Sequence, residues 1–136
     1  MIKLIVGSKG FGKTKLLIDA VNKTAETTNG SVVCIEKAMS LQFELVRSVR
    51  LIHADEYNIQ GYDVFYGFIS GVLAGNYGIK DIFVDGILRI GGDKKDMEGF
   101  ADLVEKVEAL VKDEVTVTFT VSTDIENIPE KIKKYL

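Results

Sequence analysis

The stretch Gly7-Ser8-Lys9-Gly10-Phe11-Gly12-Lys13-Thr14 decides the fold that we expect for this chain of 136 residues. It fits the pattern G-x-x-x-x-G-K-[ST], in which glycines let a loop wrap around a phosphate group with its backbone N–H groups pointing inward. In this pattern the lysine, here Lys13, reaches the β- and γ-phosphates of a nucleotide, and the hydroxyl of Thr14 ligates Mg²⁺. Every residue from Gly7 to Thr14 is therefore a candidate nucleotide-binding residue.

The flanking sequence supplies the surroundings that such a loop requires. The apolar run 2–6 indicates a buried strand before the loop, and residues 13–28 indicate a helix after it. The N-terminus of a helix carries unpaired N–H groups and a partial positive charge, so it favours a bound anion. The strand before residues 7–14 and the helix after them therefore support a phosphate-binding role for this loop.

Composition favours one α/β domain over residues 1–136, with 46% hydrophobic residues and a net charge of −3. No apolar run approaches the ~20 residues of a membrane span. Met1 leads straight into the first expected strand, so we expect no signal peptide and a cytoplasmic location. A nucleic-acid-binding domain usually shows a basic face, and the acidic balance argues against one. The one cysteine, Cys34, can form neither an internal disulfide nor a zinc cluster, and its apolar surroundings indicate the core.

Strand and helix patterns alternate along the chain, which favours a parallel sheet covered on both faces. We expect strands over 2–6, 31–35, 49–53, 81–85 and 115–121, helices over 13–28, 62–73 and 94–112, and a helix start near Pro129. Residues 41–45 alternate between apolar and polar, so we interpret them as a short extra strand that forms a hairpin with 49–53. The expected architecture is a three-layer α/β/α fold around a mostly parallel five-stranded sheet.

The aromatic residues of the 62–73 segment have two open interpretations. Tyr62, Phe65 and Tyr66 recur at helical spacing and so indicate a buried helix face. The alternatives are a platform on which a base stacks, or an interface between copies of the chain.

A second apolar strand ends in an acid. A phosphate-binding loop needs a carboxylate that orients the water shell of Mg²⁺, and this carboxylate normally ends an apolar strand. The run Ile82-Phe83-Val84-Asp85 has this form. Asp85 is therefore a candidate magnesium and catalytic residue, and the alternative is an ordinary turn aspartate before Gly86.

The sequence indicates less clearly which residue would act as the base for the water that attacks the γ-phosphate. Many ATP-hydrolysing proteins place a glutamate directly after the magnesium-binding aspartate, but here Gly86 follows. The nearest alternative is Glu56 in the run His53-Ala54-Asp55-Glu56, which also ends an apolar strand. Three interpretations stay open. Glu56 is catalytic, or Asp55-Glu56 is itself the acidic pair that ends the magnesium-binding strand, or the two residues start a helix with Asp55 as the N-cap and Glu56 as a first-turn acid.

Two further features follow these strands. Arg89 lies in the segment 86–93, where it either contacts the γ-phosphate, reaches a neighbouring subunit or is a surface residue. The last strand ends in Ser122-Thr123-Asp124, whose polar groups either sense the γ-phosphate or cap a helix.

On residues 7–14 and 82–85 the chain resembles the P-loop NTPase superfamily, with Walker A and Walker B motifs. The strands between these motifs resemble the RecA-like, additional-strand division, which implies a strand between the P-loop strand and the Asp85 strand. The resemblance implies ATP and Mg²⁺ as cofactors, bound at the carboxyl ends of the strands. The guanine-specific N-K-x-D signature is absent, because Asn22-Lys23-Thr24 is followed by Ala25.

Two classes of function follow from this resemblance. The first is an enzyme, either a slow ATPase or a small-molecule phosphotransferase, acting through Lys13 with Asp85 or Glu56. The second is a nucleotide-dependent switch whose bound ATP sets a conformation for a partner protein or a homo-oligomer, with the segment 86–93 released when the γ-phosphate is lost. A subunit of a larger ATPase assembly is a further alternative.

Overall fold

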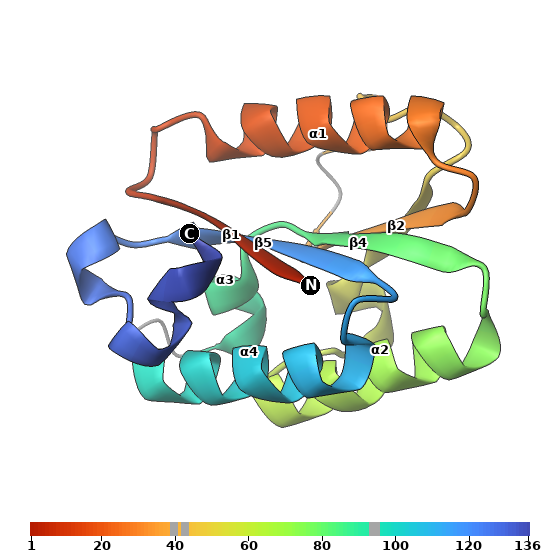
Figure 1. Ribbon diagram of the computed structural model, residues 1–136. Helices are drawn as coiled ribbons and strands as arrows, with labels where there is room; N and C mark the ends of the chain where they lie inside the picture. Colours follow the sequence, from red (N-terminus) through yellow and green to blue (C-terminus); the bar gives the residue numbers. More distant parts are fainter. Residues whose placement is uncertain (39–40, 42–43, 93–95) are drawn as a thin grey trace.

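A five-stranded parallel sheet forms the centre of the protein (Figure 1). The computed structural model describes residues 1–38, 41, 44–92 and 96–136. The strands, in chain order, are β1 (Ile2–Gly7), β2 (Ser31–Glu36), β3 (Arg50–His53), β4 (Ile79–Val84) and β5 (Thr116–Ser122). All described strand pairs are parallel, which confirms the expected sheet.

Helices cover both faces of this sheet, as the alternating pattern predicted. One face is covered by α1 (Lys13–Thr27), and the other by α2 (Tyr62–Gly75), α3 (Ile87–Gly91) and α4 (Met97–Val111) (Figure 1). Three short 3₁₀ helices complete the described elements: η1 (Ala54–Tyr57), η2 (Ile125–Asn127) and η3 (Glu130–Tyr135). Among the helices that the structure describes, none is long and apolar enough to span a membrane.

The strand order is β1-β5-β4-β2-β3. Strand β5 therefore lies between β1, which leads into the glycine-rich loop, and β4, which leads into Asp85. This is the additional strand that the RecA-like resemblance implied. Because all strands run in the same direction, their carboxyl ends meet at one edge of the sheet, where ligands of open parallel sheets bind.

The expected hairpin is not formed by the described residues of 41–45, which lie in bends and a turn, and β3 pairs with β2 in parallel, with Cys34 opposite Leu51. Leu41 lies in a bend and Glu44 in a turn, whereas Phe43 lies outside the described residues. Leu41 is fully buried and belongs to the apolar cluster beneath α1. The alternating apolar residues therefore include an anchor for the connection from β2 to β3, and their spacing imitates that of a strand.

Two helical segments differ from the prediction. The segment after Asp85, expected to be a loop, contains the short helix α3, which begins after Gly86. The helix expected from residue 94 begins at Met97, because the Asp96 side chain caps it by accepting a hydrogen bond of 2.8 Å from the Gly99 N–H. Residues 93–95 lie outside the described residues.

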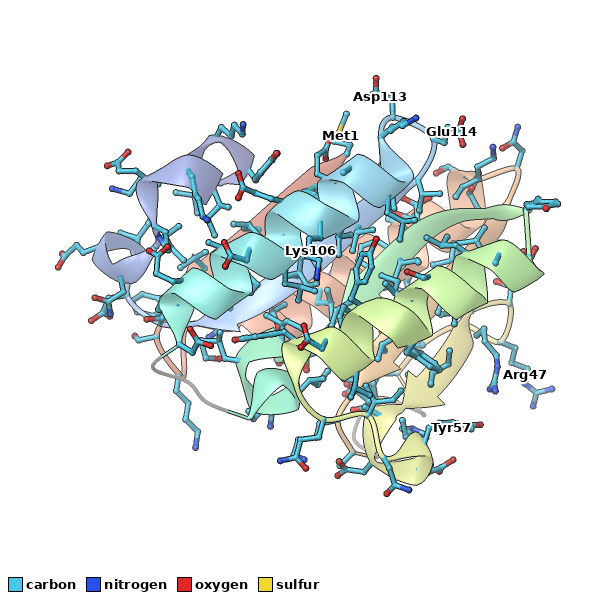
Figure 2. All side chains as sticks on the ribbon, turned by 90° about the horizontal axis from the view of Figure 1, so that it is seen from below. Met1, Arg47, Tyr57, Lys106, Asp113 and Glu114 are labelled. Atoms are coloured by element: carbon cyan, nitrogen blue, oxygen red, sulfur yellow. The ribbon has the colours of Figure 1, made fainter. Side chains whose placement is uncertain are left out.

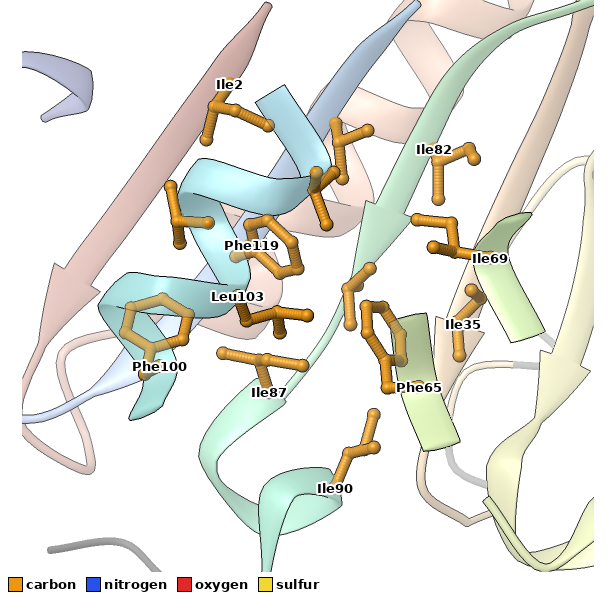
Figure 3. Close-up of a cluster of buried hydrophobic side chains, with 14 of the residues drawn as sticks. Ile2, Ile35, Phe65, Ile69, Ile82, Ile87, Ile90, Phe100, Leu103 and Phe119 are labelled. Atoms are coloured by element: carbon orange, nitrogen blue, oxygen red, sulfur yellow. The ribbon is translucent and has the colours of Figure 1, made fainter. Parts of the chain in front are cut away.

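The larger core cluster lies between the sheet and helices α2, α3 and α4 (Figure 3). Phe119 of β5 contacts Phe100 edge-on, with ring centroids 6.0 Å apart, and Phe65 at 6.2 Å. Phe65 is fully buried, and Tyr62 and Tyr66 pack against the cluster. The core interpretation of this aromatic face is thus confirmed for Phe65. The Tyr66 ring also lies 5.0 Å from the ammonium of Lys106, which extends from α4 toward α2 (Figure 2).

A smaller cluster lies between the sheet and α1, and it contains Cys34, Leu17 and Phe83. Cys34 is a buried core residue, as expected. Burial raises the pKa of its thiol, and the carboxylates of Asp85 and Glu36 raise this pKa further. The thiol is therefore held in its neutral form.

The partly buried Asp81 on β4 makes the stability of the fold depend on pH. Burial raises the pKa of its carboxyl, and Lys3 opposes this shift. The folded protein therefore holds the proton more tightly than the unfolded chain, so ionised Asp81 lowers stability above the raised pKa, and this penalty disappears as pH falls through it. We expect Asp81→Asn to raise the midpoint of urea unfolding at neutral pH, with no gain in acid.

The control for this experiment is Asp113→Asn, because Asp113 is exposed in the turn after α4 (Figure 2). Its unfolding midpoint is expected to follow that of the wild type at every pH. An Asp81→Asn variant that shows no gain at neutral pH, or the same gain in acid, would contradict the assignment.

Candidate functional site

A cavity of about 540 Å³ opens at the carboxyl edge of the sheet. Its wall is formed by the glycine-rich loop, the first turn of α1, the segment after β4 and the end of β5. The lining residues are Lys9, Gly10, Gly12, Lys13, Thr14, Asp85, Gly86, Leu88, Arg89, Thr120 and Ser122. The cavity therefore brings together two sequence motifs that lie about seventy residues apart.

The glycine-rich loop turns into α1 at Gly12, which has the left-handed φ of 75° that favours glycine. Lys13 is the first residue of the helix and is largely buried, and its Nζ donates a hydrogen bond of 3.0 Å to the Ser8 carbonyl oxygen. Gly7, Ser8 and Phe11 belong to the predicted set but are not part of the cavity lining. Phe11 is 74% exposed.

Asp85 is held at the base of the cavity and is only 4% exposed. Its backbone N–H donates to the Ile35 carbonyl at 2.8 Å. Its Oδ1 accepts a hydrogen bond of 2.8 Å from the hydroxyl of Thr120, and the same hydroxyl oxygen accepts one of 2.7 Å from the Gly86 N–H. Thr120 therefore ties the carboxylate to the start of α3.

Thr120 was not among the predicted residues. The alternation of β5 contains the signal, since Thr116, Thr118, Thr120 and Ser122 lie on one face of that strand. Sequence reasoning considered only the end of the strand. Of those residues Ser122 lines the cavity, whereas the Thr123 hydroxyl accepts a hydrogen bond of 3.1 Å from the Asn127 side chain.

Arg89 lines the cavity from α3. Its Nη2 lies 4.0 Å from Asp85 Oδ2, and its side chain is 53% exposed. Gly86 has a φ of +74°, and a Cβ at this position would lie 2.6 Å from Arg89 Nη2. The guanidinium thus lies directly over Gly86, at the place in the sequence where many ATP-hydrolysing proteins carry a glutamate.

The structure places Glu56 outside the cavity lining. Its side chain is 53% exposed, and its Oε1 lies 3.4 Å from His53 Nδ1. The N-cap of η1 is His53, so the interpretation of Asp55 as the cap is wrong, although both acids lie in the first turn. Asp55 instead forms an ion pair of 2.9 Å with Lys37.

Sequence reasoning also missed Glu36, which ends β2 and is 2% exposed. Ile35 is paired with Val84, so Glu36 lies level with Asp85 on the neighbouring strand. Glu36 Oε2 accepts a hydrogen bond of 3.1 Å from the Leu41 N–H and lies 3.4 Å from His53 Nε2. The available signal was an apolar strand ending in an acid, as at Asp85, but the predicted strand stopped at residue 35.

The donor set of the cavity fits Mg²⁺. Magnesium takes oxygen ligands and is usually held through one or two carboxylates together with substrate phosphates and waters. Thr14 contributes a hydroxyl and Asp85 a buried carboxylate to the same cavity. Among the lining residues that the structure describes, Lys9, Lys13 and Arg89 are three cationic side chains against the single carboxylate of Asp85, which favours a polyanion.

Comparisons with known proteins report on the fold. No family model matches the chain, and no curated protein matches it in sequence. Among solved structures it is similar to the flagellar accessory protein FlaH from Methanocaldococcus jannaschii, with a TM-score of 0.61 and 15% identity over 98% of this chain. The chain spans 65% of the FlaH chain. This likeness, together with the strand order, shows an α/β fold of the RecA-like kind.

Proposed function

We propose that this protein binds ATP with Mg²⁺ in the cavity and acts as a nucleotide-dependent switch for a partner protein or a second copy of itself. The observation that carries this proposal is the meeting of the glycine-rich loop, Asp85 and the polar end of β5 around one cavity. ATP is a nucleotide of the cytoplasm, so the proposal places the protein there.

Each part of the cavity has a role in this proposal. The loop N–H groups and Lys13 hold the β- and γ-phosphates, for which the Lys13 ammonium leaves the Ser8 carbonyl. Thr14 and Asp85 hold Mg²⁺, which supplies positive charge against the phosphate oxygens. Thr120 fixes the orientation of the Asp85 carboxylate through its hydroxyl.

The connection from Asp85 to α3 supports a switch. Thr120 bonds both the carboxylate of Asp85 and the backbone N–H of Gly86, which is the residue before α3. A shift of the carboxylate toward a bound ion is therefore transmitted to the start of this helix. Helix α3 comprises only residues Ile87–Gly91, so few helical hydrogen bonds hold it, but its apolar side chains are buried in the core. We therefore expect the shift to be confined to the start of the helix at Gly86.

Slow hydrolysis follows from the same geometry. The residue after Asp85 is a glycine with left-handed φ, and the space beside it is filled by the Arg89 guanidinium. Glu56 lies outside the cavity lining, and its role as a base stays a prediction. Glu36 is not among the described lining residues either, but it ends the neighbouring strand level with Asp85. A slow ATPase with Glu36 as the carboxylate that orients water is therefore the second candidate function.

Hydrogen exchange of residues 86–92 tests the switch. We expect these amides to exchange most slowly with Mg²⁺–ATP, faster with Mg²⁺–ADP and fastest without nucleotide. Phosphate release in the same samples is expected to stay far below ~1 s⁻¹, the low end of typical turnover numbers. Identical exchange in the three conditions, with nucleotide shown to be bound, would rule out the switch.

The same assay separates the two functions. If release is measurable, Glu36→Gln is compared with Glu56→Gln, because glutamine keeps the acceptor oxygen that bonds the Leu41 N–H. Loss of release in the Glu36 variant alone would support the ATPase with Glu36 as the water-orienting group. Loss in the Glu56 variant alone would restore Glu56 as the base.

A further inference from the structure

The two carboxylate oxygens of Asp85 have different surroundings. Oδ1 accepts the hydrogen bond of 2.8 Å from Thr120, whereas Oδ2 faces Nη2 of Arg89 at 4.0 Å. A buried carboxylate needs a counter-ion or several hydrogen bonds to offset its lost hydration. Arg89 is the cation that the structure places beside this one.

The backbone at Gly86 makes room for this contact. An added Cβ would lie 2.6 Å from Nη2, 2.8 Å from Nε and 3.1 Å from Cζ of Arg89. Any other residue at this position would therefore push the guanidinium away from Asp85. Gly86 is accordingly matched to Arg89, in addition to serving the left-handed start of α3.

We propose that Arg89 and Mg²⁺ are alternative counter-ions of Asp85, so that arrival of Mg²⁺ with the nucleotide displaces the guanidinium from Oδ2. This inference rests on the proposed function, because it takes the cavity as the Mg²⁺–ATP site. It adds that Arg89 is the counter-ion of Asp85 in the nucleotide-free protein, and that Mg²⁺ replaces Arg89 when Mg²⁺–ATP binds.

Charge explains why the two cations exclude each other. Thr120 bonds Oδ1 and Arg89 faces Oδ2, so an ion that binds the Asp85 carboxylate comes close to the guanidinium, and two positive charges at one carboxylate repel each other at short range. Mg²⁺ carries twice the charge of a guanidinium and lies closer to its oxygen ligands. Arg89 is half exposed and starts from a short helix, so its side chain is able to swing away.

Displacement of Arg89 changes which groups the start of α3 contacts. While Arg89 pairs with Asp85, an ion pair between residues 85 and 89 holds the first turn of α3 against the end of β4. Once Mg²⁺ replaces it, the guanidinium is released toward the phosphates that the cavity holds. Helix α3 keeps its backbone bonds, among them that from the Gly61 N–H to the Ile90 carbonyl, and its buried apolar side chains. The cation at Asp85 thus determines whether the Arg89 guanidinium pairs with the end of β4 or is available to the phosphates.

Nuclear magnetic resonance of the arginine Nε–H groups tests this exchange directly, because Arg47, Arg50 and Arg89 are the only arginines of the chain. Spectra are recorded at mildly acidic pH and low temperature for the wild type without nucleotide, with ATP and a chelator, and with ATP and Mg²⁺. Arg89→Gln assigns the Arg89 signal. Asp85→Asn removes the charge of its partner but keeps an oxygen that accepts from Thr120.

We expect Asp85→Asn to shift the Arg89 signal in nucleotide-free protein, and Mg²⁺ to shift it when added to the ATP-bound wild type. Arg47 extends outward at the periphery of the protein and serves as the internal control, whose signal stays in place (Figure 2). An Arg89 signal that ignores Asp85→Asn, or that ignores Mg²⁺ while calorimetry shows Mg²⁺–ATP bound, would overturn the exchange alone. Absence of ATP binding by calorimetry would overturn the proposed function as well.

Discussion

Lys13→Ala is expected to weaken the binding of Mg²⁺–ATP by about 30-fold or more. The Lys13 side chain is largely buried in the cavity wall and already donates a hydrogen bond to the Ser8 carbonyl, so its ammonium is held at the glycine-rich loop. Removing one partner of a desolvated, hydrogen-bonded charge pair typically costs about 2–5 kcal/mol. The measurement is a calorimetric titration of both proteins with ATP in the presence of Mg²⁺.

Lys15→Ala is the matched control for this variant. Lys15 lies two residues further along α1, is exposed and does not line the cavity. Its loss removes the same charge from the same helix, so the affinity of this variant for ATP is expected to change by less than about threefold, because an exposed charge is screened by water and salt. Equal weakening by the two variants would mean that only net charge matters, and the specific role of Lys13 would be refuted.

Phe119→Ala is expected to lower the free energy of unfolding by about 3–5 kcal/mol, the usual cost of removing a buried phenylalanine ring. Phe119 is fully buried on β5 and contacts Phe65 and Phe100, so the substitution removes the ring that joins α2 and α4 to the middle of the sheet (Figure 3). Urea unfolding followed by circular dichroism measures the change.

Phe11→Ala is the control for Phe119. The Phe11 ring is 74% exposed, so its removal is expected to change stability by no more than about 0.5 kcal/mol. A Phe119→Ala protein as stable as the wild type would mean that the core between the sheet and α2, α3 and α4 is packed differently from Figure 3.

The parts of the fold that depend on neighbouring residues were predictable. The glycine-rich motif and the apolar patterns on either side of it predicted a strand before the loop and a helix after it. Strand β1 and helix α1 lie at these positions. The run before Asp85 likewise predicted β4. Such segments carry their own signal, because hydrophobic periodicity and turn residues act over a few positions.

The parts that depend on contacts between distant segments were not predictable. The parallel pairing of β3 with β2 is decided by packing across the sheet, and the spacing of residues 41–45 does not predict this pairing. Thr120 meets Asp85 only because β5 inserts beside β4, with Val84 opposite Phe119. Glu36 lies level with Asp85 for the same kind of reason, through the pairing of β2 with β4. No sequence pattern shows such registers before the strand order is known.

Arg89 illustrates both what the sequence predicts and what it leaves open. The sequence marked it as a candidate and left its three interpretations open. Its position over Gly86 requires α3, a five-residue helix that is too short for a clear periodic pattern. The structure therefore supplies a contact with Asp85 that spacing alone does not predict.

Calorimetric titration of the wild-type protein with ATP, with and without Mg²⁺ and against GTP, shows whether the cavity binds a nucleotide. We expect one ATP to bind per chain, and Mg²⁺ to tighten this binding because Thr14 and Asp85 line the same cavity. The described lining residues belong to the phosphate and magnesium end of the site, so GTP is allowed to bind with a similar affinity. No binding of either nucleotide at millimolar concentration by the folded protein would contradict the proposed function.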